Sequence, residues 1–227
     1  KFTLGGKTSA LAGDPLAAVS CNFDSGNNLD LIVGTQGSTS LHVGDGKGGF
    51  SNGVLVVGSS FLNASHLATG DFNNDGYLDF ANSAAAFLNN KLGNFERKTS
   101  LLSGGSIAAG DINNDNKLDI VSASLTAIMV SHGNGDGTFA FGALYNTKVT
   151  LSDIAIADFN ADTYADVAVT SRDTNQVAVL FGSASGALSA PVFFATGEQP
   201  VLVAAADWNN DGRMDIAVPY RNLGQTP

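Results

Sequence analysis

Short apolar runs recur along the whole chain, separated by clusters rich in Gly, Asn and Asp. Many of these runs contain β-branched residues, as in Ile154-Ala155-Ile156 and in the stretch from Val177 to Phe181. Apolar runs of this length, bounded by turn-forming residues, predict β-strands. No stretch combines a helical period with capping residues at its ends, so we predict an all-β chain.

Nine-residue acidic segments recur along the chain, each with one short apolar run directly before it and another directly after it. They share the pattern D-x-N-x-D-x-x-x-D and occupy residues 71–79, 111–119, 158–166 and 207–215. A degenerate copy occupies residues 22–30. The first positions of the five copies are separated by 49, 40, 47 and 49 residues. A period in this range is typical of a propeller blade or a solenoid turn.

The strand-like runs on both sides of each acidic segment favour the propeller over a helical solenoid, whose helical faces are absent. A second repeated feature, seen in Gly133–Phe139, places Gly or Asn in a turn ahead of a Phe or Leu. Gly and Asn supply the positive φ angles of hairpin turns, and we expect the Phe or Leu to pack between neighbouring blades. The repeat predicts a β-propeller of about five four-stranded blades.

We predict a single β-propeller domain over residues 1–227. Its repeat units span approximately residues 9–58, 59–104, 105–149, 150–197, and 198–227 plus 1–8. Phe2 lies 20 residues before Asn22, much as Phe50 lies 21 residues before Asp71, so Lys1–Leu4 corresponds to a fourth strand. The N-terminal strand is therefore expected to close the last blade. The third strand of that blade is expected to be missing or formed only in outline by residues 220–225, so that the blade is short, is completed by a tail or partner, or belongs to a fragment of a larger ring.

Composition is that of a globular protein. The chain has 227 residues, 44% hydrophobic and 14% charged, and a single cysteine that precludes an intrachain disulfide. The formal net charge is −10, and 14 of the 21 acidic residues lie in the five acidic segments. There is no basic stripe for nucleic acid and no apolar run long enough to span a membrane. Because the chain begins at Lys1 without a signal-like segment, we expect a processed mature form or a fragment.

The acidic segments have the residue types and spacing of calcium loops. Side chains at positions 1, 3 and 5 can converge on one point, position 7 can offer a backbone carbonyl, and position 9 returns a carboxylate; calcium accepts such oxygen sets. The alternative is that D-x-N-x-D only forms Asx turns. Four copies with three aspartates each favour calcium, because clustered carboxylates repel one another unless a cation lies among them. The predicted ligands are Asp71, Asn73, Asp75, Tyr77, Asp79, Asp111, Asn113, Asp115, Lys117, Asp119, Asp158, Asn160, Asp162, Tyr164, Asp166, Asp207, Asn209, Asp211, Arg213 and Asp215.

Two segments depart from the pattern. Thr163 stands at position 6, where a β-branched residue resists positive φ, so that loop is expected to bend differently or to bind less tightly. The first segment has Asn22 and Gly26 where the others have Asp, and a weak fifth site would use Asn22, Asp24, Asn28 and Asp30. Trp208 occupies the position of Phe72, Ile112 and Phe159, so we expect a role in the core rather than as a stacking platform for a sugar.

The four acidic segments and the Gly-x-Gly-x-Phe turns resemble the FG-GAP/VCBS repeats of integrin α chains and of secreted propellers, some of them lectins. Phe181-Gly182 and Ala190-Pro191 add to the likeness. The resemblance implies calcium between the first two strands of each blade and a secreted or cell-surface setting. Rings of this family usually have seven blades, in contrast to the five counted here.

The expected function is a secreted, calcium-binding adhesion or binding module for a glycan or an extracellular protein, with structural calcium and no catalysis. One alternative is an assembly subunit that forms homo-oligomers through the incomplete blade. The other is a fragment or catalytic member of a larger propeller enzyme. No Ser-His-Asp or Cys-His set is apparent, so a catalytic pair would have to come from acids outside the calcium loops: Asp14, Asp45, Glu96, Asp136, Asp153, Asp173 and Glu198.

Overall fold

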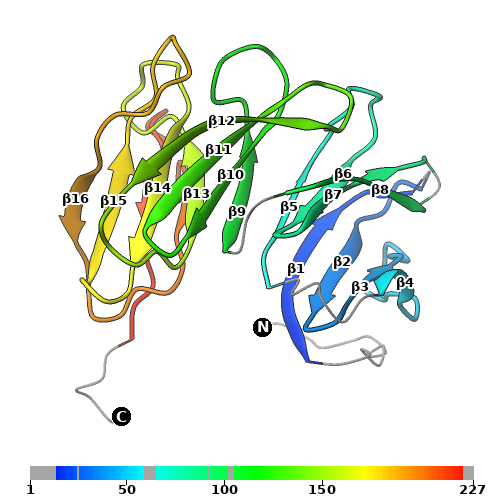
Figure 1. Ribbon diagram of the computed structural model, residues 1–227. Helices are drawn as coiled ribbons and strands as arrows, with labels where there is room; N and C mark the ends of the chain where they lie inside the picture. The colour runs from blue at the N-terminus through cyan, green and yellow to red at the C-terminus, as the bar shows by residue number, and fades with distance from the viewer. Residues whose placement is uncertain (1–13, 25, 59–64, 92, 102–104, 222–227) are drawn as a thin grey trace, which may run out of the picture. The chain divides into compact units, whose positions relative to one another are not determined.

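The computed structural model describes residues 14–24, 26–58, 65–91, 93–101 and 105–221. The chain divides into two compact units, Lys1–Leu102 with Asp136–Thr138, and Ser103–Gly135 with Phe139–Pro227. Both are built from antiparallel sheets in which consecutive strands are hydrogen-bonded neighbours (Figure 1). Where the chain is described, no helix is long and apolar enough to cross a membrane.

The first unit contains two four-stranded sheets. The first is formed by β1 (Pro15–Cys21), β2 (Asp30–Thr35), β3 (Ser38–His42) and β4 (Val54–Gly58). The second is formed by β5 (Leu67–Gly70), β6 (Asp79–Asn82), β7 (Ala85–Asn89) and β8 (Phe95–Ser100). Each acidic segment joins the first strand of a sheet to the second, as the repeat predicts.

The second unit contains two further four-stranded sheets and one shorter sheet. The third sheet is formed by β9 (Ser106–Gly110), β10 (Asp119–Ser124), β11 (Ala127–Gly133) and β12 (Phe139–Asn146). The fourth is formed by β13 (Ile154–Ala157), β14 (Asp166–Ser171), β15 (Gln176–Leu180) and β16 (Val192–Ala195). The fifth has only β17 (Ala204–Ala206) and β18 (Asp215–Ala217).

The all-β class and the propeller arrangement of the blades are therefore confirmed. The prediction of about five four-stranded blades is corrected to four such blades and a two-stranded fifth sheet in the described residues. The predicted closing strand at Lys1–Leu4 lies outside the described residues.

Apolar side chains of neighbouring sheets form the cores. In the second unit, the cluster between the third and fourth sheets joins Val121 and Val130 to Val167, Val169 and Leu180. The residue after the Gly-rich turn contributes as expected: Leu188 is 7% exposed and belongs to this cluster. In the first unit, the ring of Phe95 lies 5.9 Å from that of Phe23, which lies in the acidic loop between β1 and β2. Burial of this apolar surface is the main stabilising term for sheets of this kind.

Glycine has two separate roles in the hairpin after the third strand. Gly135, Gly137 and Gly186 adopt φ angles of 78°, 80° and 72°, as the turn prediction requires. Gly182 instead permits close approach, because a Cβ there would lie 2.3 Å from the carbonyl oxygen of Ala165. The equivalent Gly133 meets the carbonyl oxygen of Leu118 in the same way. The hairpin thus approaches the acidic segment of its own blade at backbone distance.

Candidate functional site

In each of the four complete acidic loops, the second to the fifth in the chain, the aspartate at position 1 holds the turn together. Asp158 accepts hydrogen bonds from the backbone N–H groups of Asp162 at 3.2 Å and Thr163 at 2.8 Å. Asp71, Asp111 and Asp207 accept from the same two relative positions at 2.8–3.1 Å. The first carboxylate therefore closes the loop around its own backbone.

Positions 3 and 5 add further bonds within the loop. In the fourth loop, Asn160 Oδ1 accepts from the N–H of Asp162 at 2.9 Å, and Asp162 Oδ1 accepts from the N–H of Tyr164 at 2.9 Å. The second, third and fifth loops repeat both bonds. These are the Asx-type contacts by which Asn and Asp stabilise turns.

The aspartate at position 9 is buried and joins three parts of its blade. Asp166 is 0% exposed, and its Oδ2 accepts from the N–H of Phe159 at 2.8 Å, at the start of the loop. Its Oδ1 accepts from the N–H of Gly182 at 2.7 Å, just after the third strand. Asp30, Asp79 and Asp119, each with 0% exposure, accept the equivalent two bonds, the second from Gly44 after β3, from Asn89 at the end of β7 and from Gly133 at the end of β11. Sequence spacing identified this residue but not its partners.

The backbone of the four loops is nearly identical. Position 4 has φ angles of 57°, 56°, 62° and 58°, and position 6 has 86°, 62°, 74° and 83°. Thr163 is the residue with 74°, and it makes the same bond to the first aspartate as its counterparts. The expectation that this loop bends differently is therefore wrong. The hydrogen bonds of the loop outweigh the roughly 1–2 kcal/mol that a left-handed conformation costs a residue other than Gly.

The negative charges of a loop act on one another. Burial of the Asp79 carboxyl raises its pKa to about 6; the charges of Asp71 and Asp75 add to the increase, while hydrogen bonds from Asn89 and Phe72 oppose it. Burial likewise raises the pKa of Asp166, with Asp158 and Asp162 contributing. A cation among these carboxylates would offset both the repulsion and part of the burial cost.

The donor set fits calcium in chemical type, with three carboxylates and one amide oxygen in each complete loop. Its side-chain oxygens at positions 1, 3 and 5 accept hydrogen bonds from loop N–H groups. In the described part of the chain, no three His, Cys, Asp or Glu residues are gathered as a ready-made metal cage. A carboxylate oxygen has two lone pairs, so the aspartates at positions 1 and 5 could accept these hydrogen bonds and bind a cation together.

The first loop differs from the other four, as its sequence predicts. Asn22 donates from Nδ2 to the carbonyl of Gly26, and Gly26 donates its N–H to Asp24. Asn28 donates to the carbonyl of Gly44, so its amide is used to hold the hairpin. Asp30 remains the buried residue of the set.

Trp208 is exposed, contrary to the expected core role. Its side chain is 54% exposed, whereas the equivalent Phe72 and Ile112 are 2% and 1% exposed. Phe72 is covered by the turn of the next repeat, where Gly137 donates its N–H to the carbonyl of Phe72 at 2.9 Å. Trp208 belongs to the last loop, and no further sheet follows it in the described residues.

A polar groove of about 370 Å³ lies at one end of the fourth sheet, between the turn after β14 and the segment after β16. Arg172 donates to the side-chain oxygen of Gln199 at 3.2 Å, and the N–H of Gln199 donates to Asn175 Oδ1 at 2.8 Å. Asp173 and Glu198 complete the lining. From the sequence, these two acids were considered only as possible catalytic residues. Nothing in the sequence shows that these two turns, more than twenty residues apart, are neighbours.

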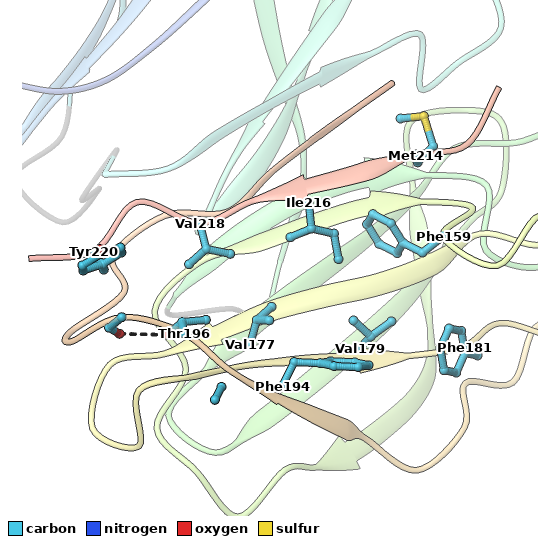
Figure 2. Close-up of a pocket in the computed structure, with 12 residues that line it drawn as sticks. Phe159, Val177, Val179, Phe181, Phe194, Thr196, Met214, Ile216, Val218 and Tyr220 are labelled. Atoms are coloured by element: carbon cyan, nitrogen blue, oxygen red, sulfur yellow. Dashed lines mark hydrogen bonds between the residues drawn. The ribbon is translucent and has the colours of Figure 1, made fainter. Parts of the chain in front are cut away.

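An apolar cleft of about 520 Å³ lies between the fourth sheet and the fifth. Val177, Val179 and Phe194 form one wall, and Ile216 and Val218 form the other (Figure 2). Tyr220 lies at one end, with its ring against Gly197, where a Cβ would be 2.2 Å from the ring. The sequence indicated an incomplete last blade but not an open cleft beside it.

Solved structures with the same fold come from several kinds of protein. The chain is similar to an Agrocybe aegerita lectin, described as recognising non-reducing terminal N-acetylglucosamine, with a TM-score of 0.61 and 17% identity over 88% of this chain and 60% of that one. The Vibrio cholerae biofilm matrix protein Bap1 has a TM-score of 0.58 and 14% identity over 84% of this chain and 30% of that one. An auxiliary nutrient binding protein from Bacteroides ovatus has a TM-score of 0.55 and 12% identity over 86% and 55%.

These identities show a shared fold alone, and the chain spans 60% or less of the length of each of these three proteins. Comparison with curated protein sequences gives no significant match. A family model described as an FG-GAP-like repeat matches residues 22–81, 111–169 and 158–218. These segments cover more than half of the chain and contain all five acidic loops, so the chain belongs to the FG-GAP-like repeat family.

Proposed function

We propose that this chain is a non-catalytic, calcium-binding propeller module of a secreted or cell-surface protein, and that it binds a glycan. The observation that carries the proposal is the polar groove of the second unit, lined by Arg172, Asp173, Asn175, Glu198 and Gln199. Binding sites combine a concave shape with a few polar groups that fix the orientation of a ligand.

The groove offers the chemistry that sugar hydroxyls require. Carboxylates accept hydrogen bonds, guanidinium groups donate them, and side-chain amides do both. Asn175 and Gln199 are held in place by their own hydrogen bonds, so two walls of the groove are ordered before a ligand arrives. Tyr220 lines the apolar cleft, is 57% exposed and packs its ring on Gly197, which precedes Glu198 of the groove in the chain. An exposed aromatic ring suits the apolar face of a sugar.

Similarity supports the same ligand class. The matched Agrocybe aegerita protein is described as a lectin for N-acetylglucosamine, and the matched Bacteroides ovatus protein as an auxiliary nutrient binding protein. Both have the fold of this chain, and their described roles are binding rather than catalysis. Calcium, ligand class and location remain parts of the proposal.

A glycan array followed by calorimetry tests the ligand class. We expect saturable binding of one glycan family to the full chain in calcium, and Glu198→Ala should weaken it at least about tenfold through loss of hydrogen bonds to the ligand. Glu96→Ala is the matched control, because Glu96 is an exposed acid in the other unit. Absence of any glycan hit, or equal affinity for both variants, would count against a glycan site in this groove.

The calcium part of the proposal assigns the four complete loops to the metal. Positions 1, 3, 5 and 9 would provide side-chain oxygens and position 7 a carbonyl, as in the residues predicted from the sequence. Bound calcium would supply positive charge at the crowded carboxylates and would stabilise the folded state by mass action.

The melting temperature tests this part separately. We expect an increase with millimolar calcium over excess chelator, and a smaller increase with magnesium, which prefers a stricter octahedral site. Calorimetry should give about four sites, and Asp207→Ala should remove one of them. An unchanged melting temperature and no heat of binding would refute the calcium assignment without affecting the glycan test.

A further inference from the structure

The polar groove at the end of the fourth sheet is formed by two segments with fixed backbones. Asn175 and Gln199 adopt positive φ angles of 56° and 51°, a conformation that is uncommon for residues other than Gly. The N–H of Gln199 donates to Asn175 Oδ1 at 2.8 Å, and the N–H of Thr196 donates to the carbonyl of Asn175 at 2.9 Å. Strained backbone that is held by such contacts is concentrated at binding and catalytic sites. The two segments are therefore fixed relative to each other and present a preformed surface.

The charges of this groove do not balance. Asp173 and Glu198 supply two carboxylates, and Arg172 supplies one guanidinium group. The other lining residues, Asn175 and Gln199, are neutral amides. The lining therefore has one more negative charge than positive charge.

Neither carboxylate is neutralised by a basic group in the part of the chain that the structure describes. Arg172 donates to the neutral side chain of Gln199 at 3.2 Å, and no ion pair joins it to Asp173 or Glu198 among the described residues. Arg221 is near along the backbone, because its N–H donates to the carbonyl of Glu198 at 2.9 Å, but it is exposed and does not line the groove. Both carboxylates are thus open to a positively charged ligand.

Unpaired carboxylates discriminate among sugars by charge. A hydroxyl group donates an ordinary hydrogen bond to a carboxylate, whereas a protonated amine donates a shorter bond of roughly twice the strength. A carboxylate or sulfate group on a sugar is repelled. The chain as a whole is also acidic, with a formal net charge of −10, so its longer-range field has the same sign. Charge complementarity therefore favours a cationic sugar over a neutral or an acidic one.

We propose that the polar groove selects amino sugars whose amine is unacetylated and protonated, over neutral and acidic sugars. This inference rests on the proposed glycan function and names the ligand class of the same site. The ammonium group of the sugar donates to the carboxylates of Asp173 and Glu198. Its hydroxyl groups accept hydrogen bonds from Arg172 and from the side-chain amide of Asn175.

Arg172 distinguishes an amino sugar from other cations. Its bond to Gln199 uses one of the five N–H donors of the guanidinium group, so the others remain for a ligand. These donors require acceptors, and their positive charge repels a second ammonium group. A polyamine or a lysine side chain has the ammonium group but lacks hydroxyl acceptors beside it. An amino sugar has both on one ring.

Calorimetry with short oligomers of glucosamine, N-acetylglucosamine and glucuronic acid, all of equal length, tests this selection. The full chain is used in calcium at about pH 6, where a primary amine is protonated. We expect the glucosamine oligomer to bind at least about tenfold more tightly than the N-acetylated one, because its hydrogen bonds are charge-assisted. Higher ionic strength should reduce this difference, since salt screens exposed charges.

Variants that remove charge but keep side-chain size locate the effect in the groove. Glu198→Gln and Asp173→Asn should each weaken binding of the glucosamine oligomer about fivefold or more and change that of the N-acetylated oligomer less than twofold. Glu96→Gln is the matched control, because it removes the same charge from an exposed acid of the other unit. It should leave the affinity ratio of the two oligomers unchanged.

Several outcomes would overturn the inference. Equal or tighter binding of the N-acetylated oligomer, or a preference for the acidic one, would exclude selection for an unacetylated amine and leave the glycan proposal intact. An effect of Glu96→Gln as large as that of Glu198→Gln would show non-specific attraction to an acidic protein. Absence of binding by all three oligomers also overturns the inference, and only an empty glycan array would refute the glycan proposal with it.

Discussion

Replacement of Asp166 by Ala should destabilise the second unit far more than replacement of Asp162, although both belong to the same loop. The Asp166 carboxylate is fully buried and accepts N–H groups at 2.8 and 2.7 Å from two separate parts of the blade. Alanine leaves both donors, which are partly buried, without this partner, at a cost of up to about 1–3 kcal/mol each. Relief of the buried charge, seen in the raised pKa of Asp166, offsets part of this loss.

We therefore expect Asp166→Ala to lower the free energy of unfolding by about 2–4 kcal/mol in the absence of calcium. At about 2–4 °C per kcal/mol for a chain of this size, this corresponds to a melting temperature lower by roughly 4–16 °C. Asp162 is exposed, and its loss should cost no more than about 1 kcal/mol.

Urea denaturation in excess chelator, followed by the fluorescence of Trp208, measures the difference within the unit that contains both residues. Each of the two variants removes a proposed calcium ligand of the same loop. Calcium should therefore increase the free energy of unfolding of both variants by less than that of the unaltered protein, and the difference should equal the contribution of one calcium site. If Asp166→Ala shifted the urea midpoint in chelator no further than Asp162→Ala, the role given to the ninth aspartate would be wrong.

Three further predictions concern single positions. NMR titration in chelator should give Asp79 a pKa of about 6, and Asp75→Asn should lower this pKa by removing a nearby negative charge. Because the pKa of Asp79 is raised in the folded state, the free energy of unfolding of the calcium-free protein should increase as the pH falls from 7 through 6. A midpoint near 4 would contradict this. Thr163→Gly should stabilise the second unit by about 0.5–1 kcal/mol in thermal denaturation, since Thr163 has a φ of 74°, and a lower melting temperature would refute the strain. Gly182→Ala should cost about 2 kcal/mol or more by the same measurement, because its Cβ would lie 2.3 Å from the carbonyl oxygen of Ala165; a neutral effect would show that the hairpin can move.

Sequence patterns were sufficient for the class, the blade unit and the position of each acidic loop. Strand length, turn residues and a period of 40–49 residues are local or regularly spaced properties, and the sheets follow them. The loop residues also adopt the turn contacts that the D-x-N-x-D pattern favours. The prediction that four of the loops hold calcium is a statement about a ligand, and it stays a prediction.

Contacts between segments that are distant in the sequence could not be predicted from these patterns. The second backbone donor of Asp79 is 10 residues away, at the end of the third strand, whereas that of Asp166 is 16 residues away, beyond the third strand, so no fixed spacing marks it. Trp208 looks like its buried counterparts in sequence and differs only because nothing described follows it to cover the ring. The polar groove joins Arg172 to Gln199 across 27 positions without a shared motif.

The buried ninth aspartate also bears on how such a chain can change its length. Each of the four complete blades contains its own carboxylate and both donors that satisfy it, so the bonds that close a blade cross no boundary between repeats. A duplicated segment of about 45 residues would bring a complete set of these bonds with it. Gain or loss of a whole repeat would therefore leave no buried charge unpaired, whereas a cut within a repeat, between its second and third strands, would leave one.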